Sequence, residues 1–189
     1  NISWWSAMED SSRDAKRFQY ERFILSQLLV MALKGVPAFY LPALLASEND
    51  IKSFSMTGQR RDLNREKFKS ENLLAVLNNP ESNANKNLKY LRNAMDVRSE
   101  LKQFHPCSEM KCLSKGRSDI VVIKRGKGPE SVFAIHNMTE NKINYQLNDN
   151  DLPKIIDNDF NTHDFLTSTK YNCKNISLDP FQVIWLSAL

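Results

Sequence analysis

The chain has 189 residues, which is enough for one domain or two small ones. Its apolar share of 41% suffices for a core, and its formal net charge of +4 is spread along the chain and mixed with acidic residues. We therefore expect a solvated surface and no nucleic-acid partner. The longest apolar candidate, residues 23–33, is shorter than the about 18 residues that span a bilayer and is broken by Ser26 and Gln27, so no membrane partner is expected.

The cysteine count indicates a reducing compartment. Cys107, Cys112 and Cys173 are an odd number without a CxxC pair, which favours free thiols in a cytoplasmic protein. A bridge between Cys107 and Cys112 stays open as the alternative. Only His105 lies close to these cysteines, so we expect no metal site and no cofactor. The N-terminus does not resemble a signal peptide and lacks an initiator methionine, so we interpret the chain as a piece of a longer protein.

In chain order, residues 15–34 place apolar side chains at helical spacing and predict a helix packed on a sheet. Gly35 ends this helix and Pro37 prevents its continuation. Residues 36–41 are apolar throughout, which predicts a buried parallel strand, although a buried antiparallel strand fits as well. The polar segment 42–64 is predicted to be a long functional loop.

Two more helices are predicted over residues 65–78 and 84–104, which end before Pro80 and Pro106 respectively. The first half of the chain thus offers a single strand, and a single strand cannot form a sheet. We therefore predict that residues 1–105 are the end of a larger α/β domain.

Beyond Pro106 the pattern changes to short β-rich runs separated by turn signals. The runs cover residues 120–123, 131–135, 143–147, 166–168 and 182–186. Such spacing predicts an antiparallel sheet or a small sandwich. Residues 106–189 are therefore predicted to form an antiparallel β domain, and the fold class is α/β followed by all-β.

Several stretches carry a resemblance to a known family. Residues 35–40 (GVPAFY) resemble the Gly-x-Pro-x-x-Tyr segment of the eighth barrel strand in the α-amylase superfamily. Residues 44–50 (LLASEND) and 57–65 (TGQRRDLNR) are similar to the sucrose phosphorylase branch of that superfamily. Residues 1–8 resemble the stretch that this branch carries after its seventh strand, and residues 178–186 resemble the last strand of its C-terminal β domain.

The resemblance implies the terminal helices and last strand of a (β/α)8 barrel, followed by a small β domain, and a retaining double displacement. A carboxylate nucleophile takes the glucosyl group, a second carboxylate protonates the leaving group, and phosphate then releases α-glucose 1-phosphate. In the family these carboxylates precede the matched region, so we expect no catalytic residue here and no activity from this chain alone. The implied partners are a sugar, inorganic phosphate, and the remainder of the barrel or another copy of the chain.

Four residues are candidates for substrate or phosphate binding. Arg61 corresponds to the phosphate-contacting arginine of the family, and a planar guanidinium suits phosphate, although a solvated loop arginine is the alternative. Arg65 is expected one helical turn beyond Arg61, where it either contacts the ligand or pairs with an acid. Asp50 lines the site or caps a turn, and Trp4 stacks on a sugar or packs against the barrel. Asn49 is interpreted as satisfying backbone groups.

One departure from the family bears on the substrate. Sucrose phosphorylases carry His after the Asn-Arg pair, whereas Glu66 and Lys67 follow it here. This favours relatives that accept sucrose 6-phosphate or glucosylglycerate. Two other functions stay open: a hydrolase or transglucosidase of the same superfamily, and a non-catalytic carbohydrate-binding or interaction module. A barrel segment would leave the apolar residues 36–41 exposed or covered by another chain, whereas a module would cover them itself.

Overall fold

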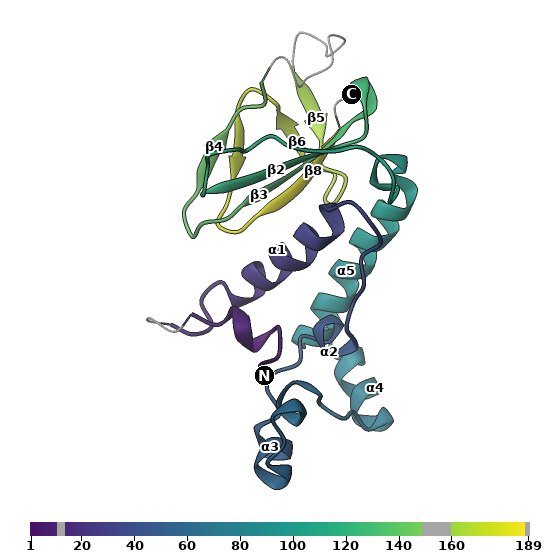
Figure 1. Cartoon of the computed structure of the whole chain (residues 1–189), viewed down its shortest axis with the longest axis vertical. Coiled ribbons are helices and arrows are strands. Elements are labelled where there is room, and N and C mark those ends of the chain that lie inside the picture. Colours follow the sequence, from purple (N-terminus) through teal and green to yellow (C-terminus); the bar gives the residue numbers. More distant parts are fainter. Residues whose placement is uncertain (11–13, 149–159, 188–189) are drawn as a thin grey trace. The chain divides into compact units, whose positions relative to one another are not determined.

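The computed structural model describes residues 1–10, 14–148 and 160–187 (Figure 1). The chain divides into two compact units. The first comprises Asn1–Ile24 and Ala38–Asn93, and the second comprises Leu25–Pro37 and Ala94–Leu189. The domain boundary expected near Pro106 stays a prediction.

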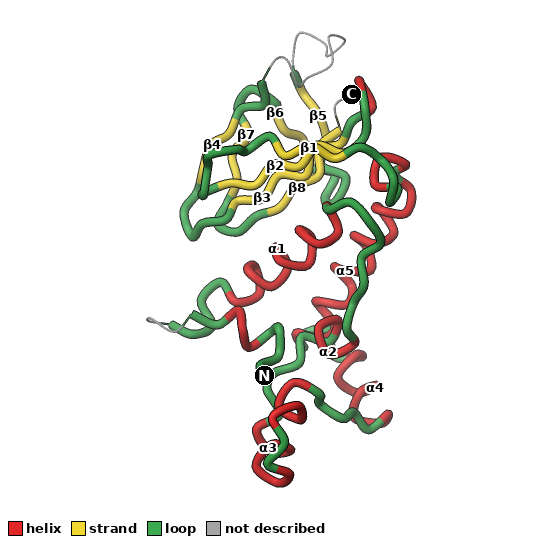
Figure 2. The backbone as a smooth tube through the Cα atoms, viewed as in Figure 1, coloured by secondary structure: helices red, strands yellow, loops and turns green. Residues whose placement is uncertain are grey.

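The helices of the structure follow the predicted order (Figure 2). Their bounds are η1 Ser6–Met8, α1 Gln19–Ala32, α2 Leu41–Leu44, α3 Ile51–Thr57, η2 Arg60–Asn64, α4 Ser70–Asn78, α5 Asn83–Glu100, η3 Lys102–Phe104 and η4 Gly128–Glu130. The three helices predicted from apolar spacing are confirmed as α1, α4 and α5. Helix α1 begins four residues later than predicted and is followed by Gly35 at φ 113°, a backbone conformation that favours glycine.

The strand predicted over residues 36–41 is not formed. Residues 36–40 have no regular structure, and α2 begins at Leu41. The described residues contain no strand that pairs with this segment, so its backbone has no ladder to join. Val36, Tyr40 and Leu41 are exposed instead, with 80%, 53% and 54% of their surface accessible, and Phe39 is half-buried. Residues 36–41 therefore have the apolar sequence of a buried strand, but no neighbouring strand among the described residues pairs with them.

The segment 42–64, predicted as a loop, is largely helical. Asp50 caps α3, because its carboxylate accepts from the Ser53 backbone N–H at 2.8 Å, and Gly58 ends α3 in the left-handed conformation at φ 65°. The Asp50 backbone N–H donates to the Leu63 carbonyl oxygen at 2.8 Å. Residues 50–64, hereafter the α3–η2 hairpin, therefore form a closed pair of short helices.

The second unit contains the antiparallel sheet that the sequence predicts. The main sheet has the order β1-β2-β3-β8, in which every neighbouring pair is antiparallel. The strands are β1 Met110–Cys112, β2 Ile120–Arg125, β3 Val132–Asn137, β4 Ile143–Tyr145, β5 Asn161–His163, β6 Lys170–Asn172, β7 Ile176–Leu178 and β8 Val183–Ser187. Strand β4 pairs with β7, and β5 with β6. Aliphatic and aromatic side chains of β2, β3, β7 and β8 form the core of this unit.

The strand predicted over residues 166–168 is wrong, because these residues follow a turn that Asp164 organises. The buried Asp164 carboxylate accepts from the Leu166 and Trp185 backbone N–H groups at 3.2 and 2.7 Å. Ser168 has φ 61°, which no strand tolerates. Burial raises the pKa of Asp164, and the hydrogen bonds that its carboxylate accepts from Thr167, Trp185 and Leu166 offset part of this shift.

Two arginines bind the carbonyl oxygens at the C-terminal end of α1. Arg125 on β2 is fully buried, lies over the Phe104 ring at 5.5 Å and donates three hydrogen bonds of 2.6–3.0 Å, the third to the His105 carbonyl. Arg98 on α5 is half-buried and donates two hydrogen bonds of 3.0 Å. Together they bind the carbonyl oxygens of Met31, Ala32, Leu33 and Gly35. These four groups have no partner within a helix, so the cations satisfy them.

The three cysteines are free thiols, so the open alternative of a Cys107–Cys112 bridge is not formed. Cys107 and Cys112 are exposed, whereas Cys173 is buried and burial raises its thiol pKa to about 11. Across the described ranges, no helix is both long and apolar enough to cross a membrane.

His136 on β3 makes the stability of the chain depend on pH. It is fully buried, its Nδ1 lies 3.2 Å from the Val121 carbonyl oxygen, and burial lowers its pKa from 6.5 to about 4. The folded chain therefore binds the proton less readily than the unfolded chain. The contribution of His136 to the free energy of unfolding is full above pH 6.5 and is lost as the pH falls toward 4, by up to about 3 kcal/mol.

Urea denaturation at pH 7 and pH 4.5 measures this loss. His136→Gln, which keeps a side-chain donor but does not titrate, should lose less stability on acidification than the original chain. Equal acid-induced losses in the two chains would show that His136 is not responsible.

Candidate functional site

A small pocket in the first unit gathers one predicted site residue with two others. Its volume is about 120 Å³, and its lining residues are Ile2, Ser3, Trp4, Tyr40, Pro42, Ala43 and Asn64. Trp4 and Tyr40 are 49% and 53% exposed and present aromatic faces, and Asn64 adds an amide. Flat apolar faces beside a few directed polar groups suit the alternating C–H and hydroxyl surface of a sugar.

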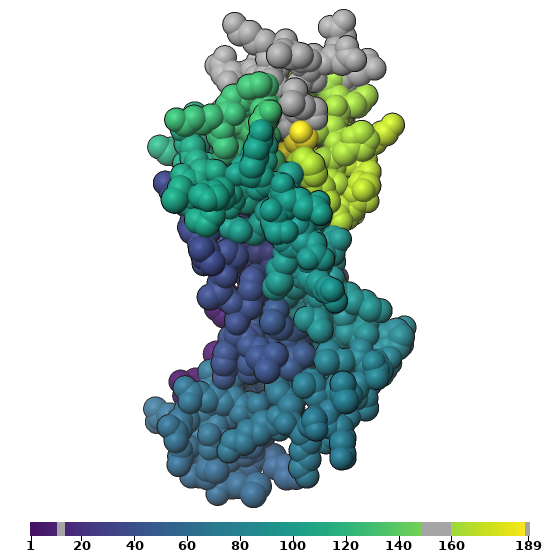
Figure 3. Space-filling view, turned by 90° about the vertical axis from the view of Figure 1, so that its right-hand side faces the viewer, coloured from purple at the N-terminus to yellow at the C-terminus, as the bar shows by residue number. Residues whose placement is uncertain are grey.

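Arg61 belongs to the α3–η2 hairpin and precedes Asn64, which lines this pocket, by three residues. Arg61 is exposed, and its Nε donates to the Gln59 side-chain oxygen at 3.0 Å. Residues of this hairpin lie at the surface, in the steel-blue part of Figure 3. The Thr57 hydroxyl donates to the Asp62 carboxylate at 2.7 Å, which braces the hairpin on which Arg61 stands. Arg61 therefore sits on an ordered support with its guanidinium in solvent.

Arg65 and Asp50 have different structural roles. Arg65 is exposed and follows η2 outside any helix, so it is not one turn further along a helix from Arg61. Within the described part of the chain, neither Arg61 nor Arg65 forms an ion pair. The Asp50 carboxylate accepts from the Ser53 N–H and hydroxyl, and these hydrogen bonds lower its pKa. The cap is thus a role that Asp50 already performs, and its contact with a ligand stays a prediction.

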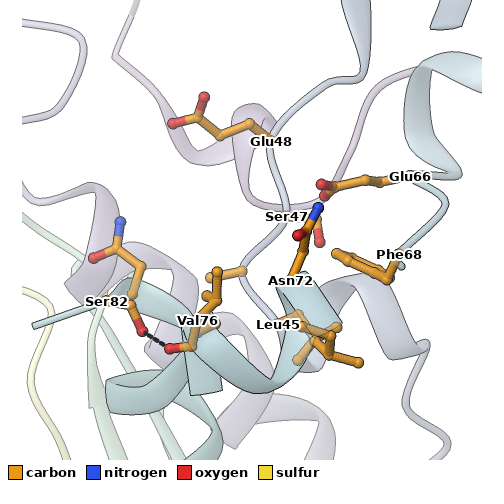
Figure 4. A pocket seen from close by; sticks show the side chains of 12 residues that line it. Leu45, Ser47, Glu48, Glu66, Phe68, Asn72, Val76 and Ser82 are labelled. Atoms are coloured by element: carbon orange, nitrogen blue, oxygen red, sulfur yellow. Dashed lines mark hydrogen bonds between the residues drawn. The ribbon is translucent and has the colours of Figure 1, made fainter. Parts of the chain in front are cut away.

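A second, larger pocket of about 340 Å³ lies between the segment before α3 and helix α4 (Figure 4). Its lining includes the carboxylates Glu48 and Glu66 and the apolar side chains of Phe68, Leu73 and Val76. It has no lysine or arginine among its lining residues, and its carboxylates disfavour an anion. We therefore take the smaller pocket and the α3–η2 hairpin as the candidate site, despite the greater volume of the second pocket.

Two asparagines hold the segments around the small pocket. The Asn49 side-chain oxygen accepts from the Ser3 backbone N–H at 2.7 Å, and the Asn49 N–H donates to the Ser6 hydroxyl at 3.1 Å. The prediction that Asn49 satisfies backbone groups is confirmed. Asn87 on α5 is fully buried, and its amide donates to two carbonyl oxygens of α2, those of Ala43 and Leu44, at 3.1 and 2.7 Å.

Sequence reasoning did not select Tyr40 and Asn64. Tyr40 was placed inside a buried strand, and Asn64 was placed at the end of a loop. Both belong to the stretches that carry the family resemblance, the Tyr of Gly-x-Pro-x-x-Tyr and the Asn of the Asn-Arg pair. Their positions in these two motifs are the sequence feature that could have identified them as candidate site residues. Trp5, beside Trp4, is buried and packs edge-on against Phe23 with ring centroids 5.2 Å apart.

Comparison with solved structures defines the class of fold. An α-amylase from Anoxybacillus aligns with a TM-score of 0.63 at 13% identity, over 89% of this chain and 32% of that chain. The trehalose-6-phosphate hydrolase of Bacillus licheniformis aligns with a TM-score of 0.63 at 16% identity, over 91% of this chain and 39% of that chain. At these identities the likeness shows the fold alone, which this chain shares with part of each of these two proteins. No protein-family model matches the chain.

Sequence similarity identifies relatives within this class of fold. The chain is 31% identical over 130 residues to a glucosylglycerate phosphorylase of Allomeiothermus silvanus, covering 69% of this chain and 23% of that protein. It is 22% identical over 187 residues to the glucosylglycerate phosphorylase of Escherichia coli, covering 98% of this chain and 31% of that protein. The chain thus spans less than a third of the length of these relatives. It corresponds to the C-terminal portion of a glucosylglycerate phosphorylase-like member of the α-amylase superfamily, which confirms the resemblance found in its motifs.

Proposed function

We propose that the protein containing this chain is a retaining α-glucoside phosphorylase that transfers glucose from glucosylglycerate, sucrose 6-phosphate or sucrose to inorganic phosphate. Similarity to three glucosylglycerate phosphorylases is the observation that carries this proposal. Glu66 and Lys67, where sucrose phosphorylases carry His after the Asn-Arg pair, support glucosylglycerate or sucrose 6-phosphate over sucrose. The product is α-glucose 1-phosphate, since a double displacement retains the configuration of the glucosidic carbon.

The chain itself contributes the phosphate and acceptor loop. A phosphorylase must hold an oxyanion where a hydrolase admits water, and the Arg61 guanidinium offers permanent charge and two parallel N–H donors for that oxyanion. Trp4, Tyr40 and Asn64 line a pocket that would take a sugar ring, and Asn64 belongs to the same short helix η2 as Arg61. No carboxylate lines this pocket among the described residues, so the nucleophile and the acid/base are assigned to the remainder of the barrel.

The proposed partner for the exposed segment is that remainder of the barrel. Val36, Tyr40 and Leu41 expose more than half of their accessible surface, although their sequence has the pattern of a buried strand. A self-contained binding module would cover such residues itself, so their exposure supports a barrel segment over a module. A second copy of the chain covering the same residues is the alternative partner. The cytoplasmic location stays a prediction.

The experiment uses the protein that contains this chain and three donors: glucosylglycerate, sucrose 6-phosphate and sucrose. We expect glucose 1-phosphate only in the presence of phosphate, with glucosylglycerate or sucrose 6-phosphate as the better donor. The 189-residue chain alone should release no product above background. Free glucose at equal rates with and without phosphate would reject the phosphorylase in favour of a hydrolase, and turnover by the chain alone would contradict its loop-only role.

A further inference from the structure

We propose that Asn49 is a positioning residue that sets the small pocket by tying the Trp4 segment to the α3–η2 hairpin. The inference rests on the proposed function, because the consequence is sugar binding by the same site. Asn49 is half-buried and lies directly before Asp50, which begins the hairpin. It reaches across more than forty positions of sequence, with its side-chain oxygen 2.7 Å from the Ser3 nitrogen and its own nitrogen 3.1 Å from the Ser6 hydroxyl.

These two hydrogen bonds flank Trp4. Ser3 is buried, and its hydroxyl accepts from the Ser6 backbone N–H at 3.1 Å, so residues 3–6 form a closed turn. Both ends of this turn are bound to Asn49, one through a side-chain acceptor and one through a backbone donor. Trp4 lies inside the turn and forms one wall of the pocket. The place of that wall therefore depends on Asn49.

Another part of the pocket lining, Asn64, depends on the next residue of the chain, Asp50. The Asp50 N–H donates to the Leu63 carbonyl oxygen at 2.8 Å, directly before Asn64, which also lines the pocket. Two consecutive residues, Asn49 and Asp50, are thus bonded to the turn that holds Trp4 and to the residue directly before Asn64. A pocket of about 120 Å³ leaves little slack, so a small shift between the walls changes how a sugar fits.

The chemistry of the Asn49 contact provides a matched pair of variants. The contact with Ser3 needs only an oxygen acceptor, which Asn49→Asp keeps. Asn49→Leu has a similar size and removes the acceptor, and it also leaves the Ser3 N–H without its partner. The Asn49 backbone N–H bond to Ser6 is unchanged in both variants. The difference between the two variants therefore isolates the side-chain oxygen.

The first test measures KM for the glucosyl donor and kcat in the phosphate-dependent reaction of the whole enzyme. We expect Asn49→Leu to raise KM roughly fivefold to tenfold with kcat changed by less than about twofold, since ground-state sugar binding is what is lost. Asn49→Asp should stay within about twofold of the original enzyme. The double variant Trp4→Ala/Asn49→Leu should have the KM of Trp4→Ala alone, because Asn49 acts through Trp4.

An equal rise in KM from Asn49→Leu with and without Trp4 would overturn the proposal. So would equal damage by Asn49→Asp and Asn49→Leu, since the acceptor oxygen would then be irrelevant. A fall in melting temperature with an unchanged KM would assign Asn49 to stability alone and also overturn it.

A second test is independent of the reaction and uses acrylamide quenching of tryptophan fluorescence in the 189-residue chain. Trp5 and Trp185 are 3% and 0% exposed, so quenching reports mainly on Trp4, which is 49% exposed. We expect Asn49→Leu to increase quenching and to have no such effect in a Trp4→Phe background. Unchanged quenching would overturn the positioning role even in an active phosphorylase. Increased quenching in a protein that forms no glucose 1-phosphate would support the contact and reject the proposed function instead.

Discussion

Replacing Arg125 with methionine is expected to lower the free energy of unfolding by about 3 kcal/mol, the largest stability effect that we predict for a single side chain. Methionine keeps an apolar stem against Phe104 but cannot donate to the carbonyl oxygens of Ala32, Leu33 and His105. Each buried acceptor left without a partner costs about 1–3 kcal/mol. The substitution also removes a buried positive charge, and burying that charge is itself unfavourable. This gain offsets part of the cost of the lost hydrogen bonds.

Arg98→Met is the matched control. Arg98 binds the carbonyl oxygens of Met31 and Gly35 at the same helix end but is only half-buried, so water can replace its donors. We expect a loss of about 1 kcal/mol for this variant. Urea denaturation at pH 7 measures both losses. If Arg125→Met loses no more than Arg98→Met, the buried guanidinium does not hold the end of α1 as described.

The second large effect concerns the reaction. Arg61→Ala is expected to lower kcat/KM for phosphate by about 100-fold, because a charge-assisted donor pair on the attacking oxyanion is lost. The guanidinium has no ion-pair partner within the described residues, so its removal breaks no contact other than the Gln59 hydrogen bond. Stability should therefore change little, which separates a loss of binding from a loss of folding.

Much of the helical and sheet structure was available from the sequence, because the relevant signals are local. Helical spacing of apolar residues predicted α1, α4 and α5, and the runs over residues 120–123, 131–135, 143–147 and 182–186 predicted β2, β3, β4 and β8. The strands β1, β5, β6 and β7 are only three residues long, too short for an alternating pattern to identify them, so only their pairing reveals them. Residues 36–41 were wrongly predicted to be a strand. An apolar run is typical of a buried strand, but it does not show whether neighbouring strands are present to pair with it.

The site was predictable in part. Arg61 came from the family resemblance and Trp4 from the suitability of a flat aromatic face for a sugar ring, whereas Tyr40 and Asn64 entered only when the pocket placed them together. Asn49 was correctly predicted to satisfy backbone groups, but no sequence pattern connects it with Ser3, 46 residues away. Arg125 stands at the start of a glycine-rich turn and reads as a solvated residue, so its burial was hidden from sequence reasoning as well.

Phosphate dependence of the Arg61 effect tests the central claim most directly. The measurement is glucose 1-phosphate formed from glucosylglycerate by the whole enzyme across a range of phosphate concentrations, for the original protein, Arg61→Ala and Arg60→Ala. Arg60 is the exposed neighbour on the same η2 turn and has no counterpart in the family resemblance. The account predicts that Arg61→Ala loses about 100-fold in kcat/KM for phosphate while Arg60→Ala stays within about threefold. Equal losses in both variants, or release of glucose that ignores phosphate, would contradict it.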